Sequence, residues 1–482
     1  MKICLIFPKW TNQYGVFSYF AKRASTIPPL NLAQLAAIAE EQGHEVKIID
    51  GEANDIPNEK MVECILGYSP DIIGLTAATP CFHIVVDLAE RIKKVSDIPI
   101  AIGGHHITIL SEKAFNAAFD FGFIGEAEAS WSLFIERFEK NQTTTDIPGI
   151  LYRDDDGTTR FTGVGRPVQD LSRLPLPARH LLNTKKYQIG TLRGKKVFTT
   201  MMTMRGCPYR CIFCNTAVFG NIVRKRSPRD VVNEIREIKE KHGIGHVMFL
   251  DDTFTLDKKH TLDICNLLIA EKLKITFECG TRANLIDEEL VAKMVEAGLI
   301  RISFGLESVN QDIRRIIRKE VPLECYDIAN KITSKYGVET LNSCMIGLPG
   351  ETLETVRETL AFLRRSREIK QANISIAMPY PGTELFNMAK RGDHGLKLMT
   401  EDFSKYQRYN SAVMTVGKLL PRDLVGIQNE AFASIYIAPL RWLPMTKKFG
   451  IVGSFLTFCR LVKVLLKGKT RFITNRQLGL KD

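Results

Sequence analysis

The sequence predicts an α/β protein with two consecutive modules and a helical C-terminal extension. Short apolar runs alternate with segments of helical spacing in two separate series, a polar stretch with prolines divides the series, and an apolar, basic tail follows. The 482 residues, 45% hydrophobic and 25% charged, suit a folded chain of two or three domains. We expect a first module at 1–145, a linker at 146–190, a second module at 191–395 and the extension at 396–482.

The first module alternates strands with helices. Strands are expected at 3–7, 45–50, 71–76, 98–102 and 121–124, and helices at 30–41, 59–66, 84–95 and 111–118. Units of this length predict a doubly wound, Rossmann-like parallel sheet with helices on both faces. Ligands of such sheets bind beyond the carboxyl ends of the strands.

Small and polar residues follow four strands of this module. They are Asp50, Thr76, Gly103, Gly104, His105, Gly125 and Glu126. Glycine lets backbone approach a large flat or phosphate-bearing ligand closely. Each residue alone is equally typical of a turn, but the four strand ends share one edge and together predict a ligand site.

The linker and the second module follow. Asp154–Gly157 predicts a hairpin turn, and the prolines of Leu174–Pro177 exclude a helix. Later strands are expected at 197–202, 246–250, 275–279, 301–304, 341–346 and 373–377, with helices at 230–241, 258–273, 287–297 and 353–365. Six parallel units predict an open, partial (β/α)6 TIM-like barrel, with its chemistry at the carboxyl ends of the strands.

Three cysteines lie within eight residues directly after the first barrel strand, at Cys207, Cys211 and Cys214. Thiolates this close together can hold one soft metal centre. A zinc loop or free buried thiols are the alternatives, but structural zinc usually takes a fourth Cys or His, and none lies within the next twenty residues. On a four-iron cluster, three such ligands would leave one iron open to substrate.

The spacing C-x3-C-x2-C, with Phe213 before the last cysteine, resembles the signature of the radical S-adenosylmethionine (SAM) superfamily. The resemblance extends over about residues 195–390. It implies that the three cysteines hold a [4Fe-4S] cluster whose open iron is chelated by the amino and carboxylate groups of SAM. One electron then cleaves SAM to methionine and a 5′-deoxyadenosyl radical, and an electron donor such as flavodoxin or ferredoxin is an implied partner.

The resemblance also implies SAM contacts at the second and third strand ends. Asp251 and Asp252 lie where the family holds the SAM amino group, although one of them alone is equally suited to cap the next helix. Arg282 carries a guanidinium suited to a carboxylate fork.

Three further strand ends complete the implied SAM site. Glu307 lies where a carboxylate accepts hydrogen bonds from ribose hydroxyls, and Gly350 with Glu351 resembles the glycine-rich nucleoside contact. Pro379 lies near the usual place of adenine. Without the resemblance, Glu307 or Glu351 would more typically be a carboxylate that caps a helix.

A doubly wound domain, a linker with prolines and a radical SAM barrel together resemble the cobalamin-dependent radical SAM enzymes, of class B methyltransferase type, over about 390 residues. The strand ends of the first module would then face the corrin. The D-x-H-x-x-G motif that supplies a cobalt ligand is absent, since His105 and His106 have no Asp two residues before them. The resemblance implies base-off cobalamin without a histidine ligand; a polar contact or a solvent-facing turn is the alternative role of either histidine.

The leading hypothesis is methylation of an unactivated carbon of a small-molecule or lipid substrate. SAM would serve twice, as the source of the methyl group on methylcobalamin and of the radical that removes a substrate hydrogen. Cyclisation, rearrangement or carbon–carbon coupling on the same cofactors is the alternative.

Two other classes are less favoured. A radical SAM methylthiotransferase would need three more cysteines for a second cluster, and Cys4 and Cys64 lie in strand and helix patterns typical of buried, inert thiols, although Cys81 is also present. A non-catalytic cobalamin sensor would not need the cysteine triad.

The net charge of +12 is concentrated in the tail. Residues 441–482 hold ten Lys and Arg against Asp482, a net +9, whereas residues 1–190 carry a net −4. In the extension, helices are expected at 402–407 and 421–437. Within 449–466, apolar and basic residues share a helical pattern that fits either packing on the barrel or peripheral contact with anionic lipid. We expect no nucleic-acid partner. The strand-like start and the lack of 18 uninterrupted apolar residues predict a cytoplasmic chain, peripheral at most to the inner face of the membrane.

Overall fold

The computed structural model describes residues 1–10, 26–191, 194–436 and 446, which form two compact units. The first unit comprises Met1–Gln188, Met204–Pro208 and Asn215–Gly243. The second comprises Ile189–Thr203, Tyr209–Cys214 and the described residues from Ile244 onward. The cysteine loop therefore contributes residues to both units.

The first unit is built on a seven-stranded sheet in the order β2-β1-β3-β4-β5-β6-β7. The strands are β1 Lys2–Phe7, β2 Glu45–Asp50, β3 Ile72–Thr76, β4 Ile100–Gly103, β5 Phe121–Phe123, β6 Ile150–Arg153 and β7 Thr159–Phe161. β1 to β5 run parallel, and the winding direction reverses beside β1, which lies between β2 and β3. The doubly wound sheet predicted from the sequence is confirmed.

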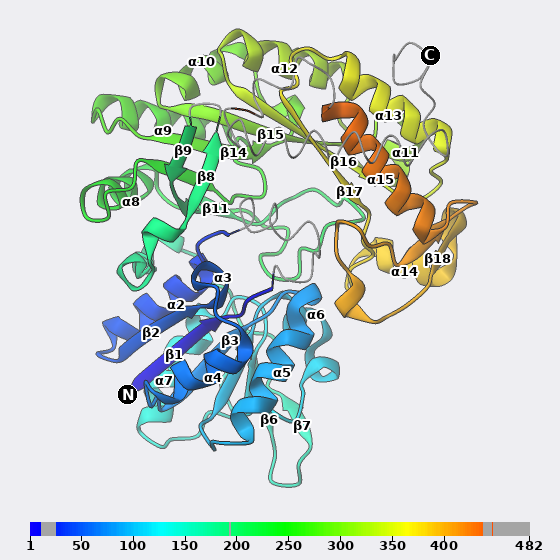
Figure 1. Ribbon diagram of the computed structural model, residues 1–482. Helices are drawn as coiled ribbons and strands as arrows, with labels where there is room; N and C mark the ends of the chain where they lie inside the picture. The colour runs from blue at the N-terminus through cyan, green and yellow to red at the C-terminus, as the bar shows by residue number, and fades with distance from the viewer. Residues whose placement is uncertain (11–25, 192–193, 437–445, 447–482) are drawn as a thin grey trace. The chain divides into compact units, whose positions relative to one another are not determined.

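Helices cover both faces of this sheet. Because successive strand side chains point to opposite faces, Ile3 and Leu5 of β1 enter one core while Cys4 and Ile6 enter the other. α2 and α7 pack on the first core, and α4, α5 and α6 pack on the second (Figure 1). The helices of this unit are α2 Leu30–Glu41, α3 Gly51–Asn54, α4 Asn58–Leu66, α5 Phe82–Lys93, α6 His105–Leu110, α7 Glu128–Glu139 and α8 Pro228–Glu240.

A hairpin extends the first sheet by two antiparallel strands, β6 and β7. Gly157 in its turn has φ of +80°, and its N–H donates to the Asp154 carbonyl at 2.8 Å. Left-handed backbone of this kind is the reason a glycine follows three aspartates. The hairpin predicted within the linker thus belongs to the sheet of the first unit.

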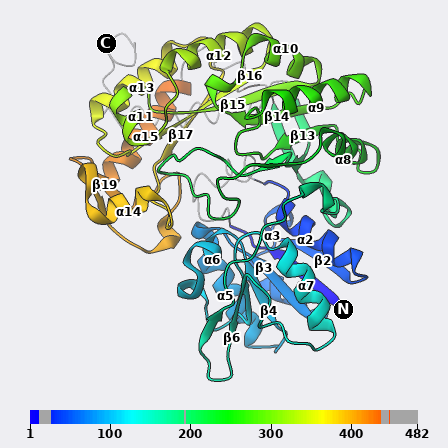
Figure 2. The ribbon, with the colours of Figure 1, turned by 180° about the vertical axis from the view of Figure 1, so that it is seen from behind.

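The second unit contains a six-stranded parallel sheet in the order β10-β13-β14-β15-β16-β17. Its strands are β10 Thr199–Met201, β13 His246–Phe249, β14 Thr276–Thr281, β15 Leu299–Glu307, β16 Glu339–Ile346 and β17 Gln371–Ile376. The helices of the described part of this unit are α9 Lys258–Ala270, α10 Glu288–Glu296, α11 Gln311–Ile316, α12 Leu323–Lys335, α13 Leu353–Arg365, α14 Glu384–Arg391 and α15 Pro421–Tyr436. Of these, α9, α10, α12 and α13 lie along the outer side of the sheet (Figure 2), whereas α14 packs beside β18 Leu396–Leu398. The partial barrel is confirmed.

Three small strand pairs accompany these sheets. They are β8 Gln188–Thr191 with β9 Gly194–Val197, β11 Met204–Arg205 with β12 Arg224–Lys225, and β18 Leu396–Leu398 with β19 Met414–Val416. The pair of β11 and β12 flanks the cysteine loop.

The last described helix, α15, covers the outer edge of β17. The Tyr436 hydroxyl donates to the Ala372 carbonyl at 2.7 Å, and Gln428 Nε2 donates to the Ile374 carbonyl at 2.9 Å. Side chains therefore satisfy backbone groups that an edge strand would otherwise expose.

Two predicted helices differ from the structure. The helix predicted at 111–118 instead begins at His105 as α6, which ends at Leu110 and is followed by a 3₁₀ turn, Ser111–Ala114. The predicted helix at 402–407 is wrong, because only the 3₁₀ turn Phe403–Lys405 forms there, after the Asp402 side chain accepts from Ser404 N–H.

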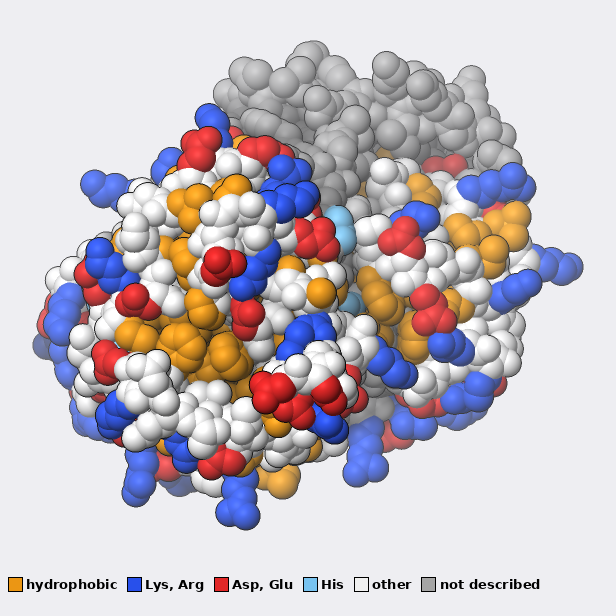
Figure 3. Space-filling model, turned by 90° about the horizontal axis from the view of Figure 1, so that it is seen from below, with side chains coloured by type: hydrophobic (Ala, Val, Ile, Leu, Met, Phe, Trp, Pro, Cys, Tyr) orange, Lys and Arg blue, Asp and Glu red, His pale blue; other side chains and the backbone are white. Residues whose placement is uncertain are grey.

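On the face seen in Figure 3, acidic and basic side chains are interspersed, apart from one compact cluster of acidic side chains. In the described part of the chain, no helix is long and apolar enough to cross a membrane. The helical segment predicted at 449–466 lies outside the described residues.

Candidate functional site

Glycines line the carboxyl ends of β4 and β5 in the first unit. A Cβ atom built on Gly103 or Gly125 would meet nothing within 4 Å, whereas one on Gly104 would lie 2.7 Å from the Ala77 carbonyl oxygen. Gly104 has φ of +103° and Gly125 has φ of +81°. Among the described residues, no atom fills the Cβ direction of Gly103 or Gly125, so a ligand can approach the backbone there, and Gly104 lets the chain turn tightly against β3.

Two polar residues predicted at this edge already have protein partners. The hydroxyl of Thr76 accepts from Asn31 Nδ2 at 3.1 Å. The carboxylate of Asp50 accepts from Ala53 N–H at 2.8 Å and from the Tyr187 hydroxyl at 2.7 Å, and burial raises its pKa. Asp50 therefore caps α3 and anchors Tyr187, and any contact with a cofactor stays a prediction.

The two histidines differ sharply. His105 is exposed at the start of α6, whereas His106 is 2% exposed. The His106 ring lies 4.2 Å from the Phe82 ring, and its Nδ1 lies 3.2 Å from the Thr79 hydroxyl oxygen. Burial lowers the pKa of His106 to about 4, so it is a neutral, internal polar contact.

Glu126 is buried in an ion network. Its carboxylate accepts from Arg205 Nη1 at 2.7 Å and from Arg224, whose second nitrogen also reaches it. Arg205 in turn pairs with Glu128 at 2.7 Å. The sequence did not reveal this network, because its members are about 80 to 100 residues apart.

The cysteine loop divides between the two units. Cys207 belongs to the first, where its N–H donates to the Gly220 carbonyl at 3.3 Å. Cys211 and Cys214 belong to the second and share a hydrogen bond from Cys214 N–H to the Cys211 carbonyl at 3.0 Å. Among the described residues, no group of three His, Cys, Asp or Glu side chains lies close enough to hold a metal ion, so the triad stays a prediction.

Cys211 has the surroundings of a thiolate. The Cys214 thiol, then Lys319 and Arg282, lower the pKa of Cys211 to about 6 although it is buried, and the pKa of Cys214 is raised because it holds the shared proton. Arg282 Nη1 lies 3.9 Å from Cys211 Sγ, and its guanidinium stacks 3.6 Å from the Tyr209 ring centre. A soft, anionic ligand atom suits an iron–sulfur cluster.

Glu307 ends β15 in strained backbone. Its φ is +63°, and the register between β15 and β16 shifts beside it. Lys319 Nζ lies 3.5 Å from Glu307 Oε1, and burial raises the pKa of this carboxyl. Strain at a buried, charged strand end is typical of a functional position. Lys319 was not identified as a site residue from the sequence, because it follows helix α11 rather than the end of a strand.

The two aspartates after β13 have separate environments. Asp251 is buried, and its Oδ1 accepts from the Thr203 N–H at 3.0 Å and the Thr203 hydroxyl at 2.7 Å. Asp252 is exposed. The next helix, α9, is capped by Asp257 rather than by either of them, because the Asp257 side chain accepts from His260 N–H.

Glu351 holds the glycine turn after β16. Its Oε2 accepts from Gly347 N–H at 2.5 Å and Leu348 N–H at 3.2 Å, while its Oε1 is buried without a hydrogen bond among the described residues. Burial raises its pKa to about 8, so at neutral pH the carboxyl largely keeps its proton. Gly350 follows the same turn with φ of +76°. Pro379 is buried beyond β17.

Two family models match the chain. The radical SAM superfamily model matches residues 201–363, and the B12 binding domain model matches residues 18–133. The first match covers β13 to β16 of the second unit, and the second match covers β2 to β5 of the first unit.

Two curated relatives are similar over most of the chain. An uncharacterized methyltransferase of Pyrococcus horikoshii is 32% identical over 446 residues, which cover 91% of this chain and 93% of the relative. An anaerobic magnesium-protoporphyrin IX monomethyl ester cyclase of Rubrivivax gelatinosus is 30% identical over 395 residues, which cover 80% of this chain and 70% of the relative.

A solved structure shares the fold. The radical S-adenosylmethionine methyltransferase TsrM from Kitasatospora setae, with cobalamin and a [4Fe-4S] cluster bound, matches with a TM-score of 0.71 at 16% identity and covers 97% of this chain and 98% of its own. The two domain matches and the relative of nearly equal length indicate the same family. The chain belongs to the cobalamin-dependent radical SAM enzymes, whose cofactors are a [4Fe-4S] cluster, SAM and cobalamin.

Proposed function

We propose that this enzyme methylates an unactivated carbon of a small-molecule or lipid substrate. The observation that carries the proposal is the 32% identity, over 91% of the chain, to a relative named as a methyltransferase. When bound, the cluster and SAM supply a hydrogen-abstracting radical, and cobalamin supplies the methyl group.

The cluster ligands in this proposal are Cys207, Cys211 and Cys214. The structure supports Cys211 most directly, because Arg282 Nη1 lies 3.9 Å from its sulfur and positive charge favours a thiolate, the form that iron binds. Arg282 and Lys319 surround it with positive charge, which lowers the electrostatic cost of thiolates in a buried site.

The second unit provides the proposed SAM contacts, at Asp251, Asp252, Arg282, Glu307, Gly350, Glu351 and Pro379. Glu307 can accept hydrogen bonds from hydroxyl groups, since Lys319 leaves its second oxygen available in the described structure. Glu351 holds the turn that presents Gly350, and its proton makes it a donor rather than a repelling charge. Asp251 is fixed by Thr203, which orients the strand end.

The first unit provides the proposed cobalamin contacts, at Asp50, Thr76, Gly103, Gly104, His105, Gly125 and Glu126. The open space beside Gly103 and Gly125 supports a bulky ring there. His106 is enclosed by Phe82 and Thr79, and this supports cobalamin without a ligand from that histidine.

Cyclisation is the second candidate function. It is favoured by the cyclase relative, which is 30% identical over 80% of the chain. Both functions require the same cofactors and differ in whether a methyl group is transferred.

Methyl-labelled SAM separates the two. The reconstituted enzyme, reduced anaerobically with dithionite, would be incubated with labelled SAM and pools of lipids and small molecules, and products would be resolved by mass spectrometry. Label in a product supports methylation. Formation of 5′-deoxyadenosine with a new but unlabelled product would overturn methylation and support cyclisation. Flavodoxin or ferredoxin replaces dithionite in a second reaction, to test the proposed electron donor.

A further inference from the structure

A buried network of four charges joins the loop after β5 to the strands that flank Cys207. Glu126 accepts from both Arg205 and Arg224, and Glu128 accepts from Arg205. Their side chains are between 2% and 11% exposed, and all four residues belong to the first unit. Two carboxylates face two guanidinium groups, so the network is neutral.

The backbone between the network and Cys207 has little freedom. Arg205 pairs with Arg224 in the ladder of β11 and β12. Gly206 has φ of +96°, and a Cβ there would lie 2.4 Å from the Ile222 carbonyl oxygen. Arg205 is therefore connected to Cys207 through a tightly packed glycine, and a shift of its side chain would be passed on to Cys207.

The other end of the network lies beside the proposed cobalamin edge. Glu126 directly follows Gly125, whose Cβ direction is open. Arg224 Nη1 also donates to the Val168 carbonyl at 2.6 Å, and the Arg205 guanidinium lies 5.3 Å from the Phe219 ring centre. These contacts fix both arginines and therefore the position of Glu126.

Stability alone is a weak reason for such a network. Buried ion pairs are often no more stabilising than apolar residues of similar volume, although removing one partner is costly. The ion pairs of Arg205 and Arg224 with Glu126, and of Arg205 with Glu128, fix the geometry of the network, which suits a role in positioning.

We infer that Arg205 is a positioning residue that couples cobalamin binding at the end of β5 to cluster binding at Cys207. This rests on the proposed function, which places ligand contacts at Gly125 and Cys207. Because the network is tightly packed, a displacement that a cofactor causes at one end is passed on to the other, so each cofactor raises the affinity for its neighbour by the same factor.

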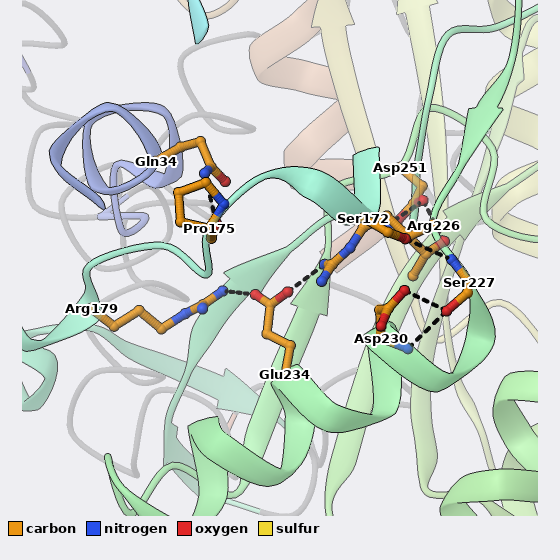
Figure 4. A network of polar contacts seen from close by, with 10 residues as sticks. Gln34, Ser172, Pro175, Arg179, Arg226, Ser227, Asp230, Glu234 and Asp251 are labelled. Atoms are coloured by element: carbon orange, nitrogen blue, oxygen red, sulfur yellow. Dashed lines mark hydrogen bonds and ion pairs between the residues drawn. The ribbon is translucent and has the colours of Figure 1, made fainter. Parts of the chain in front are cut away.

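The test compares Arg205→Lys with a matched control, Arg179→Lys. Lysine keeps the charge but cannot bridge two carboxylates as a guanidinium does. Arg179 belongs to the same unit and pairs with Glu234 at 2.6 Å, with side chains 3% and 2% exposed; Arg226 pairs with the same carboxylate (Figure 4). Figure 4 also shows the start of α8, where Asp230 N–H donates a hydrogen bond to the Ser227 hydroxyl.

The dissociation constant of hydroxocobalamin is measured for each full-length protein, with and without the reconstituted [4Fe-4S] cluster. In the wild type, the cluster should lower this constant about fivefold or more. The ratio of the constant without the cluster to the constant with it should be the same in Arg179→Lys as in the wild type. Arg205→Lys should bring it close to one while both cofactors still bind.

Three outcomes would overturn the inference. If the cluster leaves the dissociation constant of hydroxocobalamin unchanged in the wild type, the two sites are not coupled. An Arg205→Lys ratio equal to that of the wild type, even with reduced thermal stability, makes Arg205 merely structural. A wild type that binds neither cofactor refutes the proposed function as well, and this distinguishes the two failures.

Discussion

Glu307 and Lys319 form a buried pair that depends on a glycine. A Cβ on Gly305 would lie 2.5 Å from Glu307 Oε1 and 2.9 Å from Lys319 Nζ. We predict that Gly305→Ala weakens SAM binding by about tenfold, or roughly 1.4 kcal/mol, because the added methyl group displaces the Glu307 carboxylate from the position proposed to contact SAM. Equilibrium binding of SAM to the reconstituted protein measures the change. Gly245→Ala is the control, since its Cβ would meet nothing within 4 Å; equal affinities in the two variants would contradict the role of Glu307.

Glu351 makes stability depend on pH. The pKa of this carboxyl is raised from 4.5 to about 8, so the folded chain keeps a proton that the unfolded chain releases. Its contribution therefore lowers the free energy of unfolding as pH rises from 4.5 to about 8, by at most about 5 kcal/mol. Glu351→Gln keeps an acceptor for Gly347 and Leu348 but removes the titration.

Urea midpoints at pH 5, 6.5 and 8 check this prediction. The difference between Glu351→Gln and the wild type should grow in favour of the variant as pH rises. A difference that stays constant over this range would show that Glu351 ionises normally.

Residue roles were the least predictable part of the site. The strand-end positions of Glu307 and Glu351 follow from chain order, because the carboxyl ends of parallel strands share one edge. The partners of Asp50 and Glu126 do not, since Tyr187 and Arg224 come from distant segments. Local sequence carries no signal for such pairs.

At the scale of elements, α15 closes the barrel edge through Gln428. Its Nε2 donates to the carbonyls of Ile374 and Arg408, and its Oε1 accepts from Asn410 N–H, at 2.9 to 3.0 Å. We predict that Gln428→Leu lowers the free energy of unfolding by about 1–3 kcal/mol, because the buried Ile374 carbonyl loses a hydrogen bond, as do the partly buried Arg408 carbonyl and Asn410 N–H. Urea denaturation followed by circular dichroism measures it. Arg422→Ala on the exposed side of α15 should change stability by less than about 0.5 kcal/mol; a similar loss in both variants would contradict this account.

Most strands and helices could be predicted because their apolar spacing is regular. β3 is buried throughout, as its apolar run indicated. α6 was misplaced because His105-His-Ile-Thr-Ile has several β-branched residues, and the start of the helix is fixed by Gly104 rather than by helical propensity. Asp402 caps the start of segment 402–407, as it would cap a helix. Only one 3₁₀ turn follows it, however, and the chain then continues toward β19.

At the scale of the whole molecule, the charge distribution predicts where a membrane could be contacted. Residues 441–482 carry a net +9, and residues 449–466 within them have an apolar helical pattern. We predict that the full chain sediments with vesicles containing phosphatidylglycerol and that deletion of 441–482 abolishes this, because anionic lipid attracts the basic residues. Neutral phosphatidylcholine vesicles are the control. Undiminished binding by the truncated chain would refute the membrane contact.

Iron content and SAM cleavage, measured together, test the central claim that Cys207, Cys211 and Cys214 hold one cluster that binds SAM. After anaerobic reconstitution and reduction, the wild type should hold about four irons per chain and form 5′-deoxyadenosine. Alanine at any one of the three cysteines should abolish both, whereas Cys265→Ala, at a fully buried thiol in α9, should preserve both. A cluster and SAM cleavage that survive Cys211→Ala, or about eight irons in the wild type, would contradict the account.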